Sequence, residues 1–71
     1  MKVSPKKYLQ DALYYAKRGV ELNPNNGENL YTYSQILFIT TDYTKSSDYY
    51  YKAIAIKPSL KDVAIEKKFE Q

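Results

Sequence analysis

The residue types that most often carry enzyme chemistry are missing from this chain of 71 residues. It contains no cysteine and no histidine, which removes thiolate nucleophiles, the usual general base at neutral pH and the commonest metal ligand. The eight carboxylates are scattered, and no two of them are bracketed by aromatic residues in the manner of a tuned acid–base pair. We therefore expect no catalysis, no metal site and no cofactor.

Tyrosine is the abundant side chain with chemical potential. The chain has nine tyrosines, two phenylalanines and no tryptophan. A phenol can donate a proton, but tyrosines that recur along a helix face are far more often packing residues or contact surface. Their role therefore depends on the elements that position them.

Three segments that contain proline divide the chain into helical stretches. Between Pro5 and Pro24 the apolar residues recur at the spacing of one helix face, which predicts a helix over residues 5–22. Ser4 is expected to cap this helix, because a proline suits the first helical position that follows a cap. Pro24 ends it, since the residue before a proline is displaced from helical geometry.

Two more helices are expected after that break. Asn26 is expected to cap the second helix, and Asp42 is a suitable cap for the third. The third helix is predicted to continue to about Lys57, where Pro58 closes it. Both helices carry apolar and small residues at helical spacing, so each has one face to bury.

A short last helix completes the predicted fold. Ser59 and Asp62 resemble a capping box with an aspartate in the usual glutamate position, which opens a helix over residues 60–70. The sequence thus predicts an all-α fold of about four helices in a single module over residues 1–71.

The spacing of two prolines indicates a repeat. Pro24 and Pro58 lie 34 residues apart, and each follows a run that ends a helix. A helix–turn–helix unit with this period is typical of the tetratricopeptide repeat, and residues 27–60 resemble one full repeat of that family. The resemblance makes residues 5–22 the second helix of a partial repeat. It makes residues 60–70 a terminal capping helix.

The resemblance also implies which side chains pack inside the repeat. Leu30 matches the large apolar residue that opens the family's first helix, and Ala53 matches an alanine of its second helix. The turn Thr41–Tyr43 stands where the family usually has Gly-Asp-Tyr. The whole set that the resemblance places in the core or the turn is Leu30, Tyr33, Ser34, Leu37, Tyr43, Ser46, Tyr50, Ala53 and Pro58.

A second stripe on the same predicted helix is the candidate binding surface. It consists of Tyr31, Gln35, Phe38 and Ile39. In tetratricopeptide arrays this side of the first helix lines a concave groove that holds peptides. The alternative is that Phe38 and Ile39 are simply buried against the last helix, through Ile65 and Phe69. The Lys, Asn and Arg clamp by which some family members grip a C-terminal carboxylate has no counterpart here, so an apolar or helical ligand is preferred.

The first helix carries the predicted self-association face. Without a complete repeat around it, we expect this face to lack a partner in its own chain, and a second copy could supply one as a homodimer. The turn at residues 40–42 offers another route, because it could straighten and let two chains exchange helices. The face consists of Ala12, Leu13, Ala16, Gly19 and Val20.

Charge and hydropathy limit the classes of partner that we expect. The net charge of +3 divides into basic ends and an acidic middle, without the continuous basic stripe that nucleic-acid binding needs. The longest apolar run, residues 36–39, is far shorter than the roughly 20 residues that span a bilayer. No signal-peptide pattern is present, so we expect no membrane partner, and cytoplasm is the default location.

Together these patterns predict a non-catalytic protein–protein interaction module, or a fragment of a tetratricopeptide scaffold. It would bind an apolar or helical peptide segment or a second copy of itself. Two other classes stay open: a purely structural segment of a longer or designed repeat array, and nucleic-acid binding, for which a steep salt dependence would be the mark.

Overall fold

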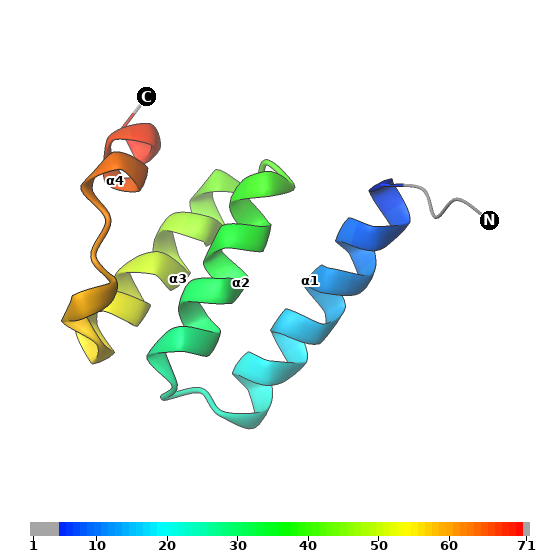
Figure 1. Cartoon of the computed structure of the whole chain (residues 1–71), viewed down its shortest axis with the longest axis horizontal. Coiled ribbons are helices and arrows are strands. Elements are labelled where there is room, and N and C mark those ends of the chain that lie inside the picture. The colour runs from blue at the N-terminus through cyan, green and yellow to red at the C-terminus, as the bar shows by residue number, and fades with distance from the viewer. Residues whose placement is uncertain (1–4, 71) are drawn as a thin grey trace.

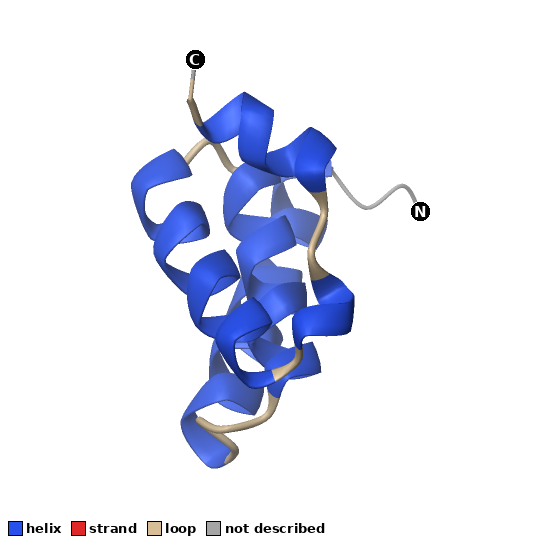
Figure 2. Cartoon of the chain, turned by 90° about the vertical axis from the view of Figure 1, so that its left-hand side faces the viewer, coloured by secondary structure: helices blue, strands red, loops and turns tan. Residues whose placement is uncertain are grey.

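The computed structural model describes residues 5–70, and this part of the chain contains helices and no strand (Figures 1 and 2). The expected all-α class with four helices is confirmed for these residues. Ser4, the expected cap of the first helix, lies outside them. In chain order the elements are α1 (Pro5–Leu22), α2 (Gly27–Ile39), α3 (Tyr43–Ile56), the 3₁₀ turn η1 (Pro58–Leu60) and α4 (Val63–Phe69).

Local capping interactions fix where α2 and α3 begin. The side chain of Asn26 accepts a hydrogen bond from the backbone N–H of Asn29 at 3.0 Å. The side chain of Asp42 accepts one from the N–H of Lys45 at 3.3 Å. Each bond satisfies a donor that the first turn of a helix leaves without a partner. Both caps are the ones expected from the sequence.

The last helix begins later than the sequence predicted. The capping box expected from Ser59 is wrong, because Pro58–Leu60 forms a 3₁₀ turn and α4 starts at Val63. Asp62 is itself the cap, and its carboxylate accepts hydrogen bonds from the next helix's N–H groups at 3.0 and 3.4 Å. The phenol oxygen of Tyr50 accepts the Asp62 N–H at 2.7 Å. This tertiary contact holds Asp62 in an extended conformation, so the helix begins only at Val63.

The turn between α2 and α3 places Thr41 in the left-handed region, with φ at 66°. The N–H of Asp42 donates to the carbonyl of Leu37 at 3.0 Å, and the N–H of Thr41 donates to that of Phe38 at 3.1 Å. These two bonds form a Schellman motif, which usually has glycine in this place. A β-branched residue there costs roughly 1–2 kcal/mol of strain.

The core lies between α2 and its two neighbours. Ser34 and Ser46 are buried where α2 meets α3, and their hydroxyls donate to each other's backbone carbonyls at 2.9 and 2.7 Å. Two of the predicted packing residues are not buried: Tyr43 is 51% exposed, and Pro58 is exposed at the start of η1. The apolar core consists of Val20, Leu30, Tyr33, Leu37, Tyr50 and Ala53.

The predicted self-association face of α1 is partly used inside the chain. Leu13 and Ala16 pack against the core, and Val20 is 9% exposed. The side-chain amide of Asn29 on α2 also donates to the carbonyl of Gly19 at 3.3 Å. The expectation that this face lacks a partner in its own chain is therefore wrong, because α2 covers it.

The helices form a row in which each runs opposite to the one before it (Figure 1). The main contacts join α1 with α2, α2 with α3, and α3 with η1 and α4. The molecule measures 41 × 31 × 18 Å. A row this thin, less than two helix diameters in its shortest dimension, leaves both broad faces and both end helices accessible.

Candidate functional site

The predicted binding stripe on α2 is divided by its contact with α4. Tyr31 and Phe38 are half-buried, whereas Gln35 is exposed and Ile39 is 60% exposed. The expected burial against the last helix therefore holds for Phe38 and not for Ile39, and the role of the stripe in binding stays a prediction. Phe38 packs against the last helix, and Ile39 remains open to solvent.

Aromatic rings form the floor on which α4 rests. The Phe38 ring lies 5.8 Å from the ring of Phe69, measured between centroids, and the two are edge to face. Tyr50 of α3 lies 5.6 Å from Phe69 and 6.3 Å from Tyr31. Edge-to-face and tilted pairs at these distances are favourable. The cluster joins α2, α3 and α4 around one buried ring, that of Tyr50.

Two hollows share Phe38 in their lining, and together we call them the α2–α4 groove. The first has a volume of about 220 Å³ and is lined by Gln35, Phe38, Ile39, Ile65 and Lys68. The second has a volume of about 300 Å³ and is lined by Phe38, Tyr43, Lys68 and Phe69. Apart from Gln35 and Lys68, the lining side chains are apolar or aromatic.

Lys68 is the charged group that both hollows share. Its Nζ lies 5.7 Å from the centroid of the Phe38 ring, within the range of a cation–π contact. No carboxylate lines either hollow among the described residues. The groove is thus apolar with a positively charged edge, which favours an anionic group beside an apolar one in whatever it binds.

A partly buried hydrogen-bond network around the hydroxyl of Tyr50 fixes α4 and hence the shape of the groove. The hydroxyl of Tyr50 donates to Oε2 of Glu66 at 2.6 Å, and Nζ of Lys61 donates to the same oxygen at 2.9 Å. Burial, and then the bond to Glu66, raise the pKa of Tyr50 to about 12. The Tyr50 bond, and then the Lys61 bond, hold the pKa of Glu66 below its ordinary value. The phenol therefore stays protonated and the carboxylate stays ionised at neutral pH.

Sequence reasoning placed Tyr50 in the core but did not predict this network. The Tyr50–Glu66 bond spans 16 residues and the Lys61–Glu66 pair spans five. Neither spacing belongs to a recognised local motif, because both depend on how α4 docks. The only available signal was a polar-tipped aromatic residue at a core position, since a buried tyrosine hydroxyl needs a partner.

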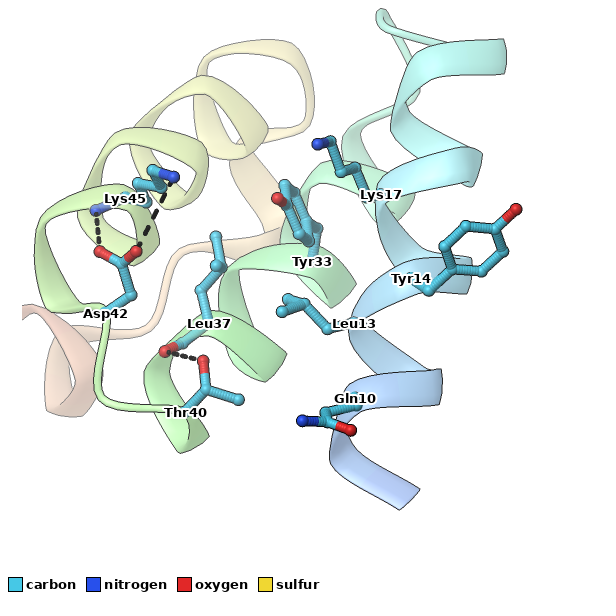
Figure 3. A pocket seen from close by; sticks show the side chains of 9 residues that line it. All are labelled: Gln10, Leu13, Tyr14, Lys17, Tyr33, Leu37, Thr40, Asp42 and Lys45. Carbon is cyan, nitrogen blue, oxygen red and sulfur yellow. Dashed lines mark hydrogen bonds and ion pairs between the residues drawn. The ribbon is translucent and has the colours of Figure 1, made fainter. Parts of the chain in front are cut away.

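A further hollow of about 520 Å³ was also not expected (Figure 3). It lies between α1 and the start of α3, above α2, and Leu13, Tyr33 and Leu37 form its apolar floor. Burial raises the pKa of Tyr33, which makes that phenol a poorer acid. Asp42 is engaged as a helix cap. This hollow is an uncovered edge of the core.

Within residues 5–70, no group of three or more side chains could hold a metal ion. None of the helices described there is both long and apolar enough to cross a membrane. Comparisons with protein-family models, with curated proteins and with solved structures found no significant match to the chain. Its function is therefore argued from the geometry of the described residues.

Proposed function

We propose that the chain is a non-catalytic protein-interaction module with a tetratricopeptide-like arrangement, and that it binds an amphipathic helical peptide segment in the α2–α4 groove. The observation that carries this proposal is the position of Ile39. It is 60% exposed and lies beside Phe38 and Ile65 in a ready-formed hollow. Concave apolar sites with a few polar groups at the edge are where ligands usually bind.

Two features support the repeat-like arrangement. The antiparallel pair α2–α3 is joined by a tight turn, and its closest approach uses small residues, Ser34, Ser46 and Ala53, all nearly inaccessible to solvent. The prolines that end α1 and α3 lie 34 residues apart, which is the period of that repeat family. In such an arrangement the α2–α4 groove would be the concave surface.

The chemistry of the groove suggests the character of the ligand. Two hollows that share the Phe38 ring suit two apolar side chains on one face of a helix. Lys68, at the edge of both hollows, suits a carboxylate on the flank of the same helix. An amphipathic segment with apolar residues at i and i+4 and an adjacent acidic residue meets both requirements.

The proposal is tested with a pair of synthetic helical peptides that carry two leucines at i and i+4. One peptide has glutamates on the flank and the other has lysines. Titration followed by backbone amide NMR is expected to shift the signals of Gln35, Ile39, Ile65 and Lys68. The glutamate peptide is expected to bind more tightly, and its advantage should shrink as salt is added.

Matched variants locate the binding surface. Ile39→Glu places a charge in the groove and should abolish binding of the glutamate peptide. Val63→Glu is the control, because Val63 is 57% exposed, similar to Ile39, but lines neither hollow. Circular dichroism should show equal helicity for both. Failure of the parent to bind either peptide, or equal loss in both variants, would contradict the proposal.

A further inference from the structure

The first helix carries a second apolar stripe whose large side chains its own chain leaves exposed. Its members alternate at spacings of four, three, four and three residues, the seven-residue pattern of helices that pair side by side. The three large members, Tyr8, Tyr15 and Leu22, are 68%, 71% and 69% exposed. The outer α1 stripe consists of Tyr8, Ala12, Tyr15, Gly19 and Leu22.

This stripe borders a groove between α1 and α2. The groove has a volume of about 330 Å³ and its α2 side is formed by Asn29, Thr32 and Ile36. On the α1 side, Ala12 and Gly19 leave the hollow and Tyr15 forms the ridge. In Figure 1, α1 stands at the end of the row, and no other described element lies on its outer side.

We propose that the outer α1 stripe packs against the α1 helix of a second copy, antiparallel about a two-fold axis. The alternation of small and large residues along the stripe favours the antiparallel orientation. In an antiparallel pair, Ala12 faces Tyr15 of the second copy and Gly19 faces its Tyr8, so each ring fills the space above a small residue. A parallel pair would set alanine against alanine and tyrosine against tyrosine, leaving gaps and collisions in turn.

Charge complementarity favours the same orientation. Asp11 and Arg18 each precede a small residue of the stripe, on the side of α1 away from the core residues Leu13 and Val20. In the antiparallel pair, Asp11 of one copy lies beside Arg18 of the other, and the two-fold axis repeats this contact. In the parallel pair the same positions face Leu9 and Ala16 and gain no charge contact.

The surface differs from the one predicted from the sequence. Of the five residues predicted for self-association, only Ala12 and Gly19 belong to the outer α1 stripe. Leu13 and Val20 pack inside the chain, so the dimer must use the neighbouring stripe with its exposed rings. The α2–α4 groove lies elsewhere, and the dimer leaves it accessible.

Sedimentation equilibrium of the full chain tests this proposal. The parent is expected to form dimers at high micromolar concentration, because one helix pair is a small interface. Tyr15→Glu should raise the dimer Kd more than about tenfold, since it places a charge among apolar groups. Tyr14→Glu is the matched control: Tyr14 is also exposed, at 60%, but lines the hollow of Figure 3, so its Kd should stay near the parent value.

Charge reversal tests the orientation. Asp11→Arg and Arg18→Asp should each raise the Kd several-fold, because each creates two like-charge contacts. The double variant should recover most of the parent affinity. A parent that stays monomeric at millimolar concentration would overturn the dimer. The stripe would then bind a different protein or nothing at all. Equal weakening by Tyr14→Glu and Tyr15→Glu, or a double variant no better than the singles, would overturn the antiparallel stripe.

Discussion

Helices α1 and α3 both pack against α2 and each ends two residues before a proline, yet they are buried to different extents. On α3 all three compared residues are fully inaccessible to solvent, whereas on α1 their counterparts are half-buried. The difference comes from the neighbours, because the main contacts of α3 are with both α2 and α4, whereas those of α1 are with α2. The compared pairs are Ala12 and Ser46, Ala16 and Tyr50, and Gly19 and Ala53.

The role of a helix face thus depends on which neighbouring helix packs against it. Tyr50 reaches past α2 to α4 and binds Glu66 there. Ala16, its counterpart on α1, ends in a methyl group and has no further helix to reach. Of these two residues 34 positions apart, Tyr50 is thus an anchor between helices, whereas Ala16 lines the edge of an open groove.

The largest expected effect comes from giving α3 the residue that α1 has. Tyr50→Ala should destabilise the fold by about 3–5 kcal/mol, because it removes a fully buried ring and leaves a cavity. That loss is comparable to the whole stability expected for a chain of this length, roughly 4–10 kcal/mol. Urea denaturation followed by circular dichroism measures it. Tyr14→Ala on α1 serves as the exposed control, and similar midpoints for the two variants would contradict the comparison.

A smaller loss is expected from overfilling the α2–α3 contact. Ala53→Leu should cost about 1–3 kcal/mol, since Ala53 is completely buried and the helices cannot separate without disturbing the core. Ala55→Leu, on the exposed side of the same helix, should be nearly neutral. The difference between their urea midpoints is the measurement. A midpoint for Ala53→Leu equal to that of Ala55→Leu would mean that the contact has room.

The same substitution, glycine to alanine, is expected to change the stability in opposite directions at the two glycines. A β-carbon on Gly27 would lie 3.0 Å from Cβ of Lys57 and 3.3 Å from the carbonyl of Ala53, whereas on Gly19 it would meet only Asn29 at 3.7 Å. Gly27→Ala should therefore destabilise by about 1 kcal/mol. Gly19→Ala should stabilise by about 0.5–1 kcal/mol, because glycine weakens a helix interior. Thermal unfolding of both variants decides, and shifts of the same sign would contradict this.

The smallest expected effect is a pH dependence of stability, which arises where α4 joins α3 and not at α1. The folded state lowers the pKa of Glu66 from its ordinary value of 4.5, so its contribution is present above that value and is lost as the pH falls through the lowered pKa. The pKa of Tyr50 is raised to about 12, so its contribution is lost as the pH rises from about 10 to 12. The network therefore anchors α4 between these limits.

Comparing the parent with Glu66→Gln isolates the acid limb of this dependence. The gap between their urea midpoints should be constant at neutral pH and should close in acid, where the glutamate is protonated. In base, absorbance of tyrosinate should show that Tyr50→Phe removes a phenol that titrates at about pH 12. A gap that stays open in acid would show that the Glu66 charge does not contribute.

The sequence predicted most of the secondary structure because the signals were local. Pro24, Asn26, Asp42 and Pro58 each act within one helical turn, and the end of α1, the starts of α2 and α3 and the end of α3 follow from them. The start of α4 could not be read in this way. A hydrogen bond from Asp62 to Tyr50, 12 residues earlier, decides it.

The candidate surfaces were predicted less completely for a related reason. Helical periodicity identifies stripes, but it does not say which neighbouring helix covers each one. On α2, the stripe was found and its division between Phe38 and Ile39 was not. On α1, the covered residues Leu13 and Val20 were assigned to self-association, because the packing of α2 against them depends on the approach of a separate helix.

The row of helices also bears on how quickly the chain folds. Each helix meets the next after a connection of only a few residues, so little loop entropy is lost before a contact forms. Proteins with such local contacts fold in roughly microseconds to milliseconds. We expect the α2–α3 hairpin, which holds most of the buried residues, to form first, with α1 and α4 closing onto it. Temperature-jump relaxation would show this order as slower folding in Ala53→Leu than in Gly19→Ala.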